Sequence, residues 1–267
     1  MPDTEPPAAD TAQPALADRA GRGLRWAAMV MLLGIGLCGL AASAVGVAHQ
    51  LLPRQFTVAQ QRQIINWQMT RRWRAMAAGK IFPAAVAYTI PAGAVNARHG
   101  LVLQARRLGI SQAAGCASAV SGPAATVLAA SHCSAVLRAT YVDSSGSMVV
   151  TVGVAVMPDA EAAAAAAHRL AARGQGLSLA VRALPVAGTL ASGFRDHQRQ
   201  LSVADSFGPY VVLSTAGFTD NRPHVRLTSD YYYDQEMAGL ADSLAQSTGA
   251  LIGATPTPPK CPDAPGC

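Results

Sequence analysis

An uncharged apolar run from Trp26 to Ala48 constrains this chain more than any other feature. In a helix that rises about 1.5 Å per residue, a run of this length crosses the roughly 30 Å hydrocarbon core of a bilayer. No other stretch of the chain is comparably apolar. The sequence therefore predicts one transmembrane helix, residues 24–48, and a single-pass protein of the cell membrane.

A cleaved signal peptide is the competing interpretation of this run. Small residues at Ala42–Ala44 and at Val47–Ala48 resemble a peptidase site. However, the apolar run is longer than a usual signal core, and a long hydrophilic segment precedes it. These two features favour a retained anchor.

Proline and small residues dominate both ends of the chain. Residues 1–23 nearly lack large apolar side chains, so they are predicted to form a disordered cytoplasmic tail. Residues 254–267 repeat proline with small residues and predict a second disordered tail. The length between the membrane segment and this tail suits one domain rather than two, which we assign to residues 81–253.

Residues 55–80 predict an amphipathic helix beside the membrane. Thr57 can cap its start, and Gln60 completes a capping box. Tryptophan beside arginine is typical of a helix that lies at a membrane surface, although the tryptophans could equally dock on the chain's own domain. The candidate contacts to lipid headgroups or to a partner in this helix are Arg62, Trp67, Arg71, Arg72, Trp73 and Arg74.

The distribution of charge is more informative than the net charge of +6. No acidic residue occurs between Asp18 and Asp143, whereas arginines are frequent in this stretch. Anionic headgroups attract such segments by about 1 kcal/mol per charge near the membrane surface. Nucleic acid would also attract them, but a membrane tether makes headgroups the better interpretation, so no nucleic-acid partner is predicted.

The positive-inside rule does not decide the orientation of the chain, because arginines flank the membrane segment on both sides. The cysteines are therefore used to predict the orientation. Cys116 and Cys133 lie in the domain, and Cys261 and Cys267 lie in the tail, which fits two disulfide pairs. Disulfides persist outside the cytoplasm, and neither pair has a metal-like C-x-x-C spacing. We therefore predict a cytoplasmic N-terminus and an extracytoplasmic domain.

The domain alternates strand-like and helix-like segments. The run 148–156 is almost entirely apolar, so it is expected to be a central strand covered on both faces. Short connections favour an antiparallel or mixed sheet with helices packed on one face, which is an α+β fold. A long loop is expected between 184 and 207. Strands are predicted at 82–90, 101–110, 135–142, 148–156, 177–184 and 210–216. Helices are predicted at 121–132, 158–173 and 229–247.

No assembled catalytic motif is present in the sequence. It lacks G-x-S-x-G and a phosphate-binding glycine loop, and no two histidines are spaced i, i+4. We therefore predict a non-enzymatic domain without cofactor or metal, which binds or senses an envelope protein or lipid. Tyr231, Tyr232 and Tyr233 form the densest aromatic site, and they suit either a partner interface or packing on the sheet.

Two alternatives stay open. An envelope hydrolase could form its site from the loops 188–207 and 220–224, with His197 and His224 as key residues. An accessory subunit of a larger membrane complex could pair through the smooth face of its anchor, next to Cys38. The small residues of that face are Gly34, Gly36 and Gly39.

Two stretches of the chain carry a family resemblance. One runs from Phe56 through Trp73 to Pro83, and the other joins Leu137–Asp143 with Thr151–Pro158. Both are similar to uncharacterised single-pass membrane proteins of actinobacteria, over residues 55–217. The resemblance implies a tethered extracytoplasmic domain and brings no catalytic residues.

Overall fold

The computed structural model describes residues 25–38, 40, 43, 55–90, 101–172, 180–225 and 231–258. The chain divides into two units, Thr57–Pro258 and a second unit made of Met1–Phe56 with Pro259–Cys267. In the second unit, residues 25–38 are helical. The first unit contains all the strands described below.

The predicted anchor is only partly covered by the described residues, because 24, 39, 41, 42 and 44–48 lie outside them. Within the described part of the chain, no helix combines the length and the apolar character needed to cross a bilayer. The transmembrane helix therefore stays a prediction. The tail at 1–23 and residues 259–267, with Cys261 and Cys267, also lie outside the described residues.

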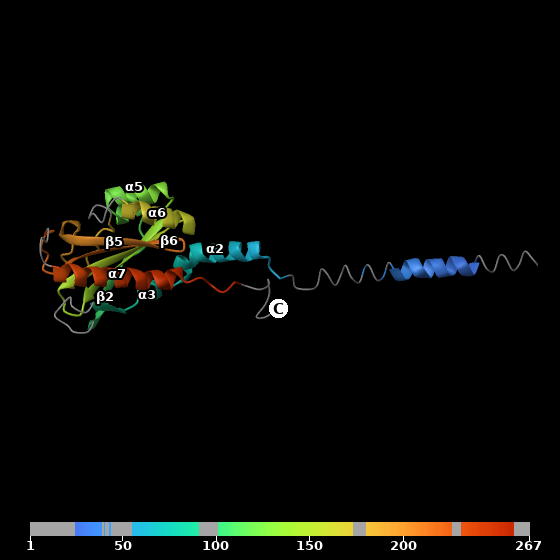
Figure 1. Ribbon diagram of the computed structural model, residues 1–267, viewed down its shortest axis with the longest axis horizontal. Helices are drawn as coiled ribbons and strands as arrows, with labels where there is room; N and C mark the ends of the chain where they lie inside the picture. Colours follow the sequence, from blue (N-terminus) through green and yellow to red (C-terminus); the bar gives the residue numbers. More distant parts are fainter. Residues whose placement is uncertain are drawn as a thin grey trace, which may run out of the picture. The chain divides into compact units, whose positions relative to one another are not determined.

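Six strands form one curled antiparallel sheet in the order β1-β2-β3-β4-β6-β5 (Figure 1). The almost entirely apolar β4 is central, and all its residues are buried, as predicted. The edges are β1 and β5. The strands are β1 (Ala85–Ile90), β2 (Leu101–Ile110), β3 (Ala135–Asp143), β4 (Met148–Val156), β5 (Arg199–Phe207) and β6 (Tyr210–Phe218).

Helices cover both faces of this sheet, so the expectation of helices on one face is wrong. Figure 1 shows α7 on one side, and α5 with α6 on the other. In β4 one set of alternating residues is apolar and the other contains only Thr151 as a polar residue, so the strand has no polar side that would indicate an open face. The helices are α2 (Val58–Ala75), α3 (Ala78–Ile81), α4 (Cys116–Ala119), α5 (Gly122–Ala130), α6 (Ala160–Ala172) and α7 (Tyr231–Gly253), with a 3-10 turn η2 (Asp196–Gln198).

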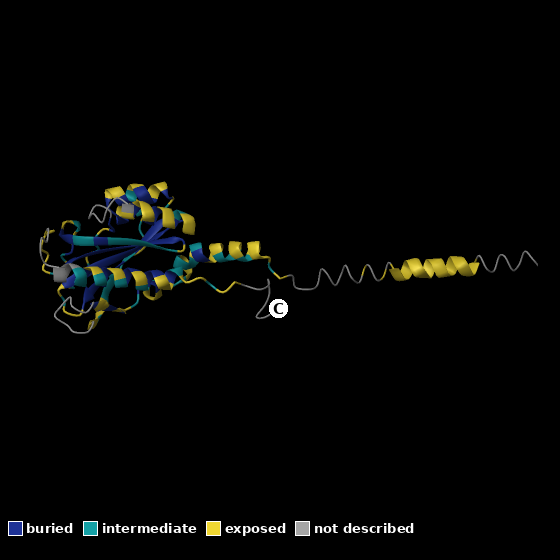
Figure 2. Cartoon of the chain, viewed as in Figure 1, coloured by how far each residue is buried: buried dark blue, intermediate teal, exposed yellow. Residues whose placement is uncertain are grey.

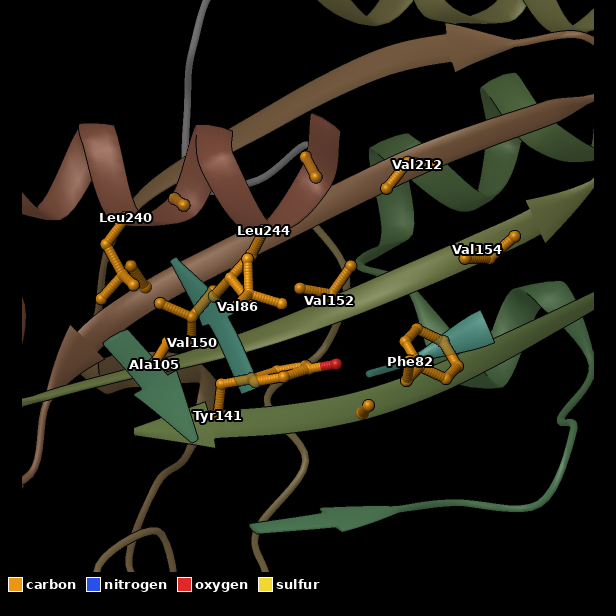
Figure 3. Close-up of a cluster of buried hydrophobic side chains, with 14 of the residues drawn as sticks. Phe82, Val86, Ala105, Tyr141, Val150, Val152, Val154, Val212, Leu240 and Leu244 are labelled. Atoms are coloured by element: carbon orange, nitrogen blue, oxygen red, sulfur yellow. The ribbon is translucent and has the colours of Figure 1, made fainter. Parts of the chain in front are cut away.

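One core fills the face beneath α7, which we call the α7 face. Leu240 and Leu244 of α7 pack against Val150 and Val152 of β4 and Tyr141 of β3 (Figure 3). All five side chains are buried, and burying a side chain of this size contributes roughly 1.5–3 kcal/mol. This cluster reaches all six strands, so it holds the sheet together as one body.

The opposite face, which we call the strap face, is covered by α4, α5, α6 and by residues 180–186, the strap. The strap crosses the strands instead of pairing along them. Its Leu184 donates its backbone N–H to the Thr151 hydroxyl (3.0 Å), and its carbonyl accepts a hydrogen bond from the Thr140 hydroxyl (2.7 Å). Val181 forms an isolated bridge with Val120. Polar bonds to two strands therefore fix this segment.

Gly153 of β4 makes the crossing possible. A Cβ atom at this position would lie 2.7 Å from a methyl carbon of Val181, which is far closer than van der Waals contact. Hydrogen in place of a side chain lets the strap lie directly on the central strand. The outer surfaces of α5, α6 and α7 are exposed, whereas the sheet between them is buried (Figure 2).

Two further predictions on this face are wrong. The described part of 177–184 contains no strand, because the strap forms only that single bridge, and 188–207 is not one loop, because Arg199–Phe207 is β5. The strap has a strand-like composition but runs across the sheet, so it cannot pair with it. In β5, Leu201, Val203 and Phe207 lie on one face, but Asp205 interrupts their alternation and Ala204 is apolar, so the strand signal is weak.

Candidate functional site

Helix α2 begins where the sequence predicts. Thr57 is its N-cap: the Thr57 backbone N–H donates to Gln60 Oε1 (2.9 Å), and the Gln60 backbone N–H donates to the Thr57 hydroxyl (3.3 Å). This reciprocal capping box fixes the first turn. No acidic residue lies in that turn, and Arg72 and Arg74 occupy the last turn, where they complement the negative end of the helix dipole.

The C-terminal half of α2 docks on its own domain. Met69 is 5% exposed, and its carbonyl accepts a hydrogen bond from the hydroxyl of Tyr210 in β6. Burial raises the pKa of Tyr210 to about 12, so this hydroxyl stays protonated and can donate. Trp73 and Met76 pack against the core of the α7 face. For Trp73, the structure thus confirms the docking interpretation.

The opposite side of α2 is basic and exposed. Trp67 is 56% exposed, and the guanidinium of Arg71 lies 4.7 Å from the centre of its ring. Arg74 stacks in the same way on Trp73, at 4.8 Å. Arg62 is exposed nearer the start of the helix. Because α2 contains no acidic residue, no charge within the helix neutralises this surface.

The start of the predicted C-terminal tail lies along α2. Arg72 donates a hydrogen bond to the carbonyl of Ala254, directly after α7. A groove between α2 and residues 255–257 is lined by Gln68, Arg71 and Arg72 among others. Arg72 is therefore partly used in holding the tail, whereas Arg71 combines an exposed position with a place on this groove. This contact could not be predicted, because a proline-rich tail carries no pairing signal.

One predicted disulfide is present. Cys116 and Cys133 are bonded (S–S 2.01 Å, Cα–Cα 6.3 Å), which ties the start of α4 to the segment after α5. This pairing confirms the prediction. Tyr231, Tyr232 and Tyr233 form the first turn of α7, but their side chains lie outside the described part of the structure.

The two loops of the hydrolase alternative do meet. The His224 backbone N–H donates to the His197 carbonyl (3.0 Å), and both residues are exposed. Their neighbouring carboxylates are already engaged: Asp220 pairs with Arg222, and Asp196 accepts from the backbone N–H of Ala183 (2.8 Å). Across the described residues, no group of three or more His, Cys, Asp or Glu side chains could hold a metal. The contact is therefore one of backbones rather than an assembled acid–base pair.

No family model, curated protein or solved structure matches the chain.

Proposed function

We propose that this chain is a single-pass membrane protein whose extracytoplasmic domain binds at the surface of the cell membrane without catalysis. In this proposal α2 lies against anionic lipid headgroups beside the anchor, residues 24–48. The domain then stands on the membrane through a basic helix and presents its sheet and loops to the envelope.

The exposed pair of Trp67 and Arg71 carries the proposal. A large aromatic ring left 56% exposed, with a guanidinium 4.7 Å from its centre, suits the boundary between headgroups and acyl chains. Each arginine near an anionic surface contributes about 1 kcal/mol of attraction, and α2 carries no acidic residue to oppose it.

The docked half of α2 supports this arrangement. Met69 and Trp73 fix the helix on its domain, so the Trp67 side is turned away from the core without further conformational change. A surface that is already ordered loses little conformational entropy when it binds. The Cys116–Cys133 disulfide supports the extracytoplasmic location, because such bonds persist in oxidising compartments.

Lipid contact can be measured by quenching with brominated lipids in the full chain reconstituted in nanodiscs. A Trp26→Phe variant leaves Trp67 and Trp73 as reporters. We expect brominated phosphatidylglycerol to quench it more than brominated phosphatidylcholine. The extra quenching should disappear when Trp67→Phe is added, and also when Arg71→Gln is combined with Arg74→Gln.

A matched control removes the same charge elsewhere. Arg195→Gln combined with Arg222→Gln changes two exposed arginines outside α2 and should leave the quenching unchanged. Equal quenching by the two lipids, or no component that depends on Trp67, would contradict the headgroup contact.

The location of the domain requires a separate experiment. A membrane-impermeant maleimide, applied to intact cells, should label Cys116 and Cys133 only after reduction. If both cysteines stay protected in intact cells and react as free thiols after lysis, the extracytoplasmic location is wrong.

A further inference from the structure

Two arginines pair with one aspartate at the strap, and a third arginine lies close to this pair. Arg182, in the strap, lies 3.3 Å from a carboxylate oxygen of Asp196, and Arg199, at the start of β5, lies 3.8 Å from the other. Arg138 of β3 contacts the same peptide unit of the strap, because its guanidinium donates to the Arg182 carbonyl (3.5 Å), whereas Asp196 accepts from the following N–H, of Ala183 (2.8 Å). The single carboxylate cannot balance three guanidinium groups, so the cluster keeps an excess of positive charge.

Backbone carbonyls occupy part of the hydrogen-bonding capacity of this cluster. Arg182 donates from Nε to the carbonyl of Val120 (3.0 Å), and Arg199 donates to the carbonyl of Val181 (3.3 Å). These bonds hold the strap and position the guanidinium groups. Carbonyls bring no negative charge, however, so they leave the excess of positive charge in place.

Two buried polar atoms next to the cluster have no hydrogen-bond partner among the described residues. They are Nε of Arg138 and the hydroxyl oxygen of Ser111. The two residues are cross-strand neighbours, since the Ser111 backbone N–H donates to the Arg138 carbonyl (2.9 Å). Side chains of such neighbours share one face of the sheet and lie about 5 Å apart at Cβ. Both atoms can donate a hydrogen bond, and both face the side on which the strap lies.

Electrostatics agree with this geometry. Burial lowers the pKa of the Arg138 guanidinium, the Asp196 carboxylate opposes that shift, and the nearby positive charge of Arg182 adds to it. An arginine side chain does not lose its proton in a protein, so the charge persists despite this unfavourable environment. A bound anion would relieve both the repulsion and the unpaired donors.

We propose that Ser111, Arg138, Arg182 and Arg199 form a binding site for the oxyanion group, carboxylate or phosphate, of a small ligand. The planar guanidinium group can donate two parallel N–H hydrogen bonds to the oxygens of either a carboxylate or a phosphate. Arg199 is nearly buried and forms the floor, whereas the side chain of Arg182 is 45% exposed and leaves the site open to solvent. The site lies on the strap face, and it does not depend on the proposed contact of α2 with lipid.

Inorganic phosphate and acetate are the probes for this site. The full chain should be titrated with each anion at constant ionic strength, with chloride as the reference, following phosphate by the ³¹P NMR line width and both anions by the melting temperature. We expect at least one of the two anions to bind. Bound phosphate broadens the ³¹P line, and either bound anion raises the melting temperature of the chain. Phosphate alone indicates a phosphorylated ligand, and acetate alone indicates a carboxylate.

Substitutions then locate the site. Arg182→Gln should weaken anion binding by about tenfold, because it removes a charge-assisted hydrogen bond. Arg138→Lys is the second variant, for use if Arg182→Gln fails to fold. It keeps the charge but loses the unpaired Nε donor, and it should also weaken binding. Arg62→Gln removes the same charge from α2 and should change the affinity less than about twofold. Absence of binding, or binding that Arg62→Gln weakens and Arg182→Gln does not, would overturn the proposal.

Discussion

The two faces of the sheet are covered by different means. The α7 face is covered mainly by α7, a helix of 23 residues, with α2 and α3 also in contact with the core. This core includes five aromatic side chains: Phe82, Tyr88, Tyr141, Tyr210 and Phe218. Over the strap face lie short helices whose main cluster has no aromatic member among the described residues and many alanines. A disulfide and the polar bonds of the strap complete that second cover.

This difference follows from how much apolar area each side chain can bury. Alanine removes little area from water, so an alanine-rich layer adds less stability per residue than a layer of Leu, Val and Tyr. The strap face therefore depends on cross-links and hydrogen bonds to stay closed. The same requirement places arginine, aspartate, serine and threonine near the sheet, which makes this face the one with polar groups available for a ligand.

The largest effect is expected on the α7 face. Leu240→Ala removes a fully buried side chain and should lower the free energy of unfolding by about 2–5 kcal/mol, since α7 cannot collapse into the cavity. Urea denaturation of the full chain, followed by circular dichroism, measures this. Leu251→Ala is the matched control on the same helix, because Leu251 is 40% exposed and should cost far less. Equal losses would mean that α7 does not anchor this core.

The disulfide provides the next test. Cys116→Ala combined with Cys133→Ala opens a link between residues 17 apart and should cost about 3 kcal/mol, mainly because the unfolded chain gains freedom. Reducing agent should destabilise the native chain by a similar amount and leave the double variant unchanged. A native chain insensitive to reduction would show that the alanine-rich layer holds by packing alone, which would remove the contrast between the faces.

Gly153 tests the strap itself. Gly153→Ala places a methyl group 2.7 Å from Val181 and should cost about 1–3 kcal/mol through overpacking. Adding Val181→Ala should restore part of the loss, and a double-mutant cycle measures this coupling. Gly122→Ala, on the same face with no neighbouring atom within 4 Å, should be neutral or slightly stabilising. Additive effects of Gly153→Ala and Val181→Ala would contradict direct contact.

Local signals made much of the fold predictable. The hairpin of β3 and β4 depends on neighbouring residues and a short turn, and Asp143 closes that turn by accepting from the Met148 backbone N–H (2.7 Å). The capping box of Thr57 and Gln60 is equally local. The strap was missed because its position depends on β3 and β4, which are distant in sequence. β5 was missed although its partner β6 follows directly after the turn at Gly208 and Pro209, because Asp205 interrupts the apolar alternation of the strand.

The same limit applies to the candidate sites. Trp67 and Trp73 are six residues apart, which is about 600° around a helix, so they face different sides and one ring is exposed while the other packs. That division was implicit in the sequence. The pairing of Arg182 and Arg199 with Asp196, with Arg138 close by, was not, because it exists only where the strap crosses the sheet.

The smallest predicted effect concerns a polar group on the α7 side of the comparison. Burial, and secondly the charge of Asp143, raise the pKa of Glu236 in α7. The folded chain therefore binds this proton more tightly than the unfolded chain, so stability falls as the pH rises from the ordinary glutamate pKa to the raised one. At neutral pH the ionised side chain is unfavourable. Because Glu236 is partly exposed and solvent screens its charge, Glu236→Gln should stabilise by no more than about 0.5 kcal/mol.

The pH dependence separates this cause from others. Below about pH 4 the wild-type side chain is protonated in both states, so the advantage of Glu236→Gln should vanish. Glu161→Gln is the control, because Glu161 lies in the first turn of α6, where a negative charge is favourable, and it should give no gain at either pH. A gain from Glu236→Gln that persists at low pH would instead indicate new hydrogen bonds of the amide. In that case, the α7 face would contain no electrostatic cost, and the contrast with the charged strap face would be sharper.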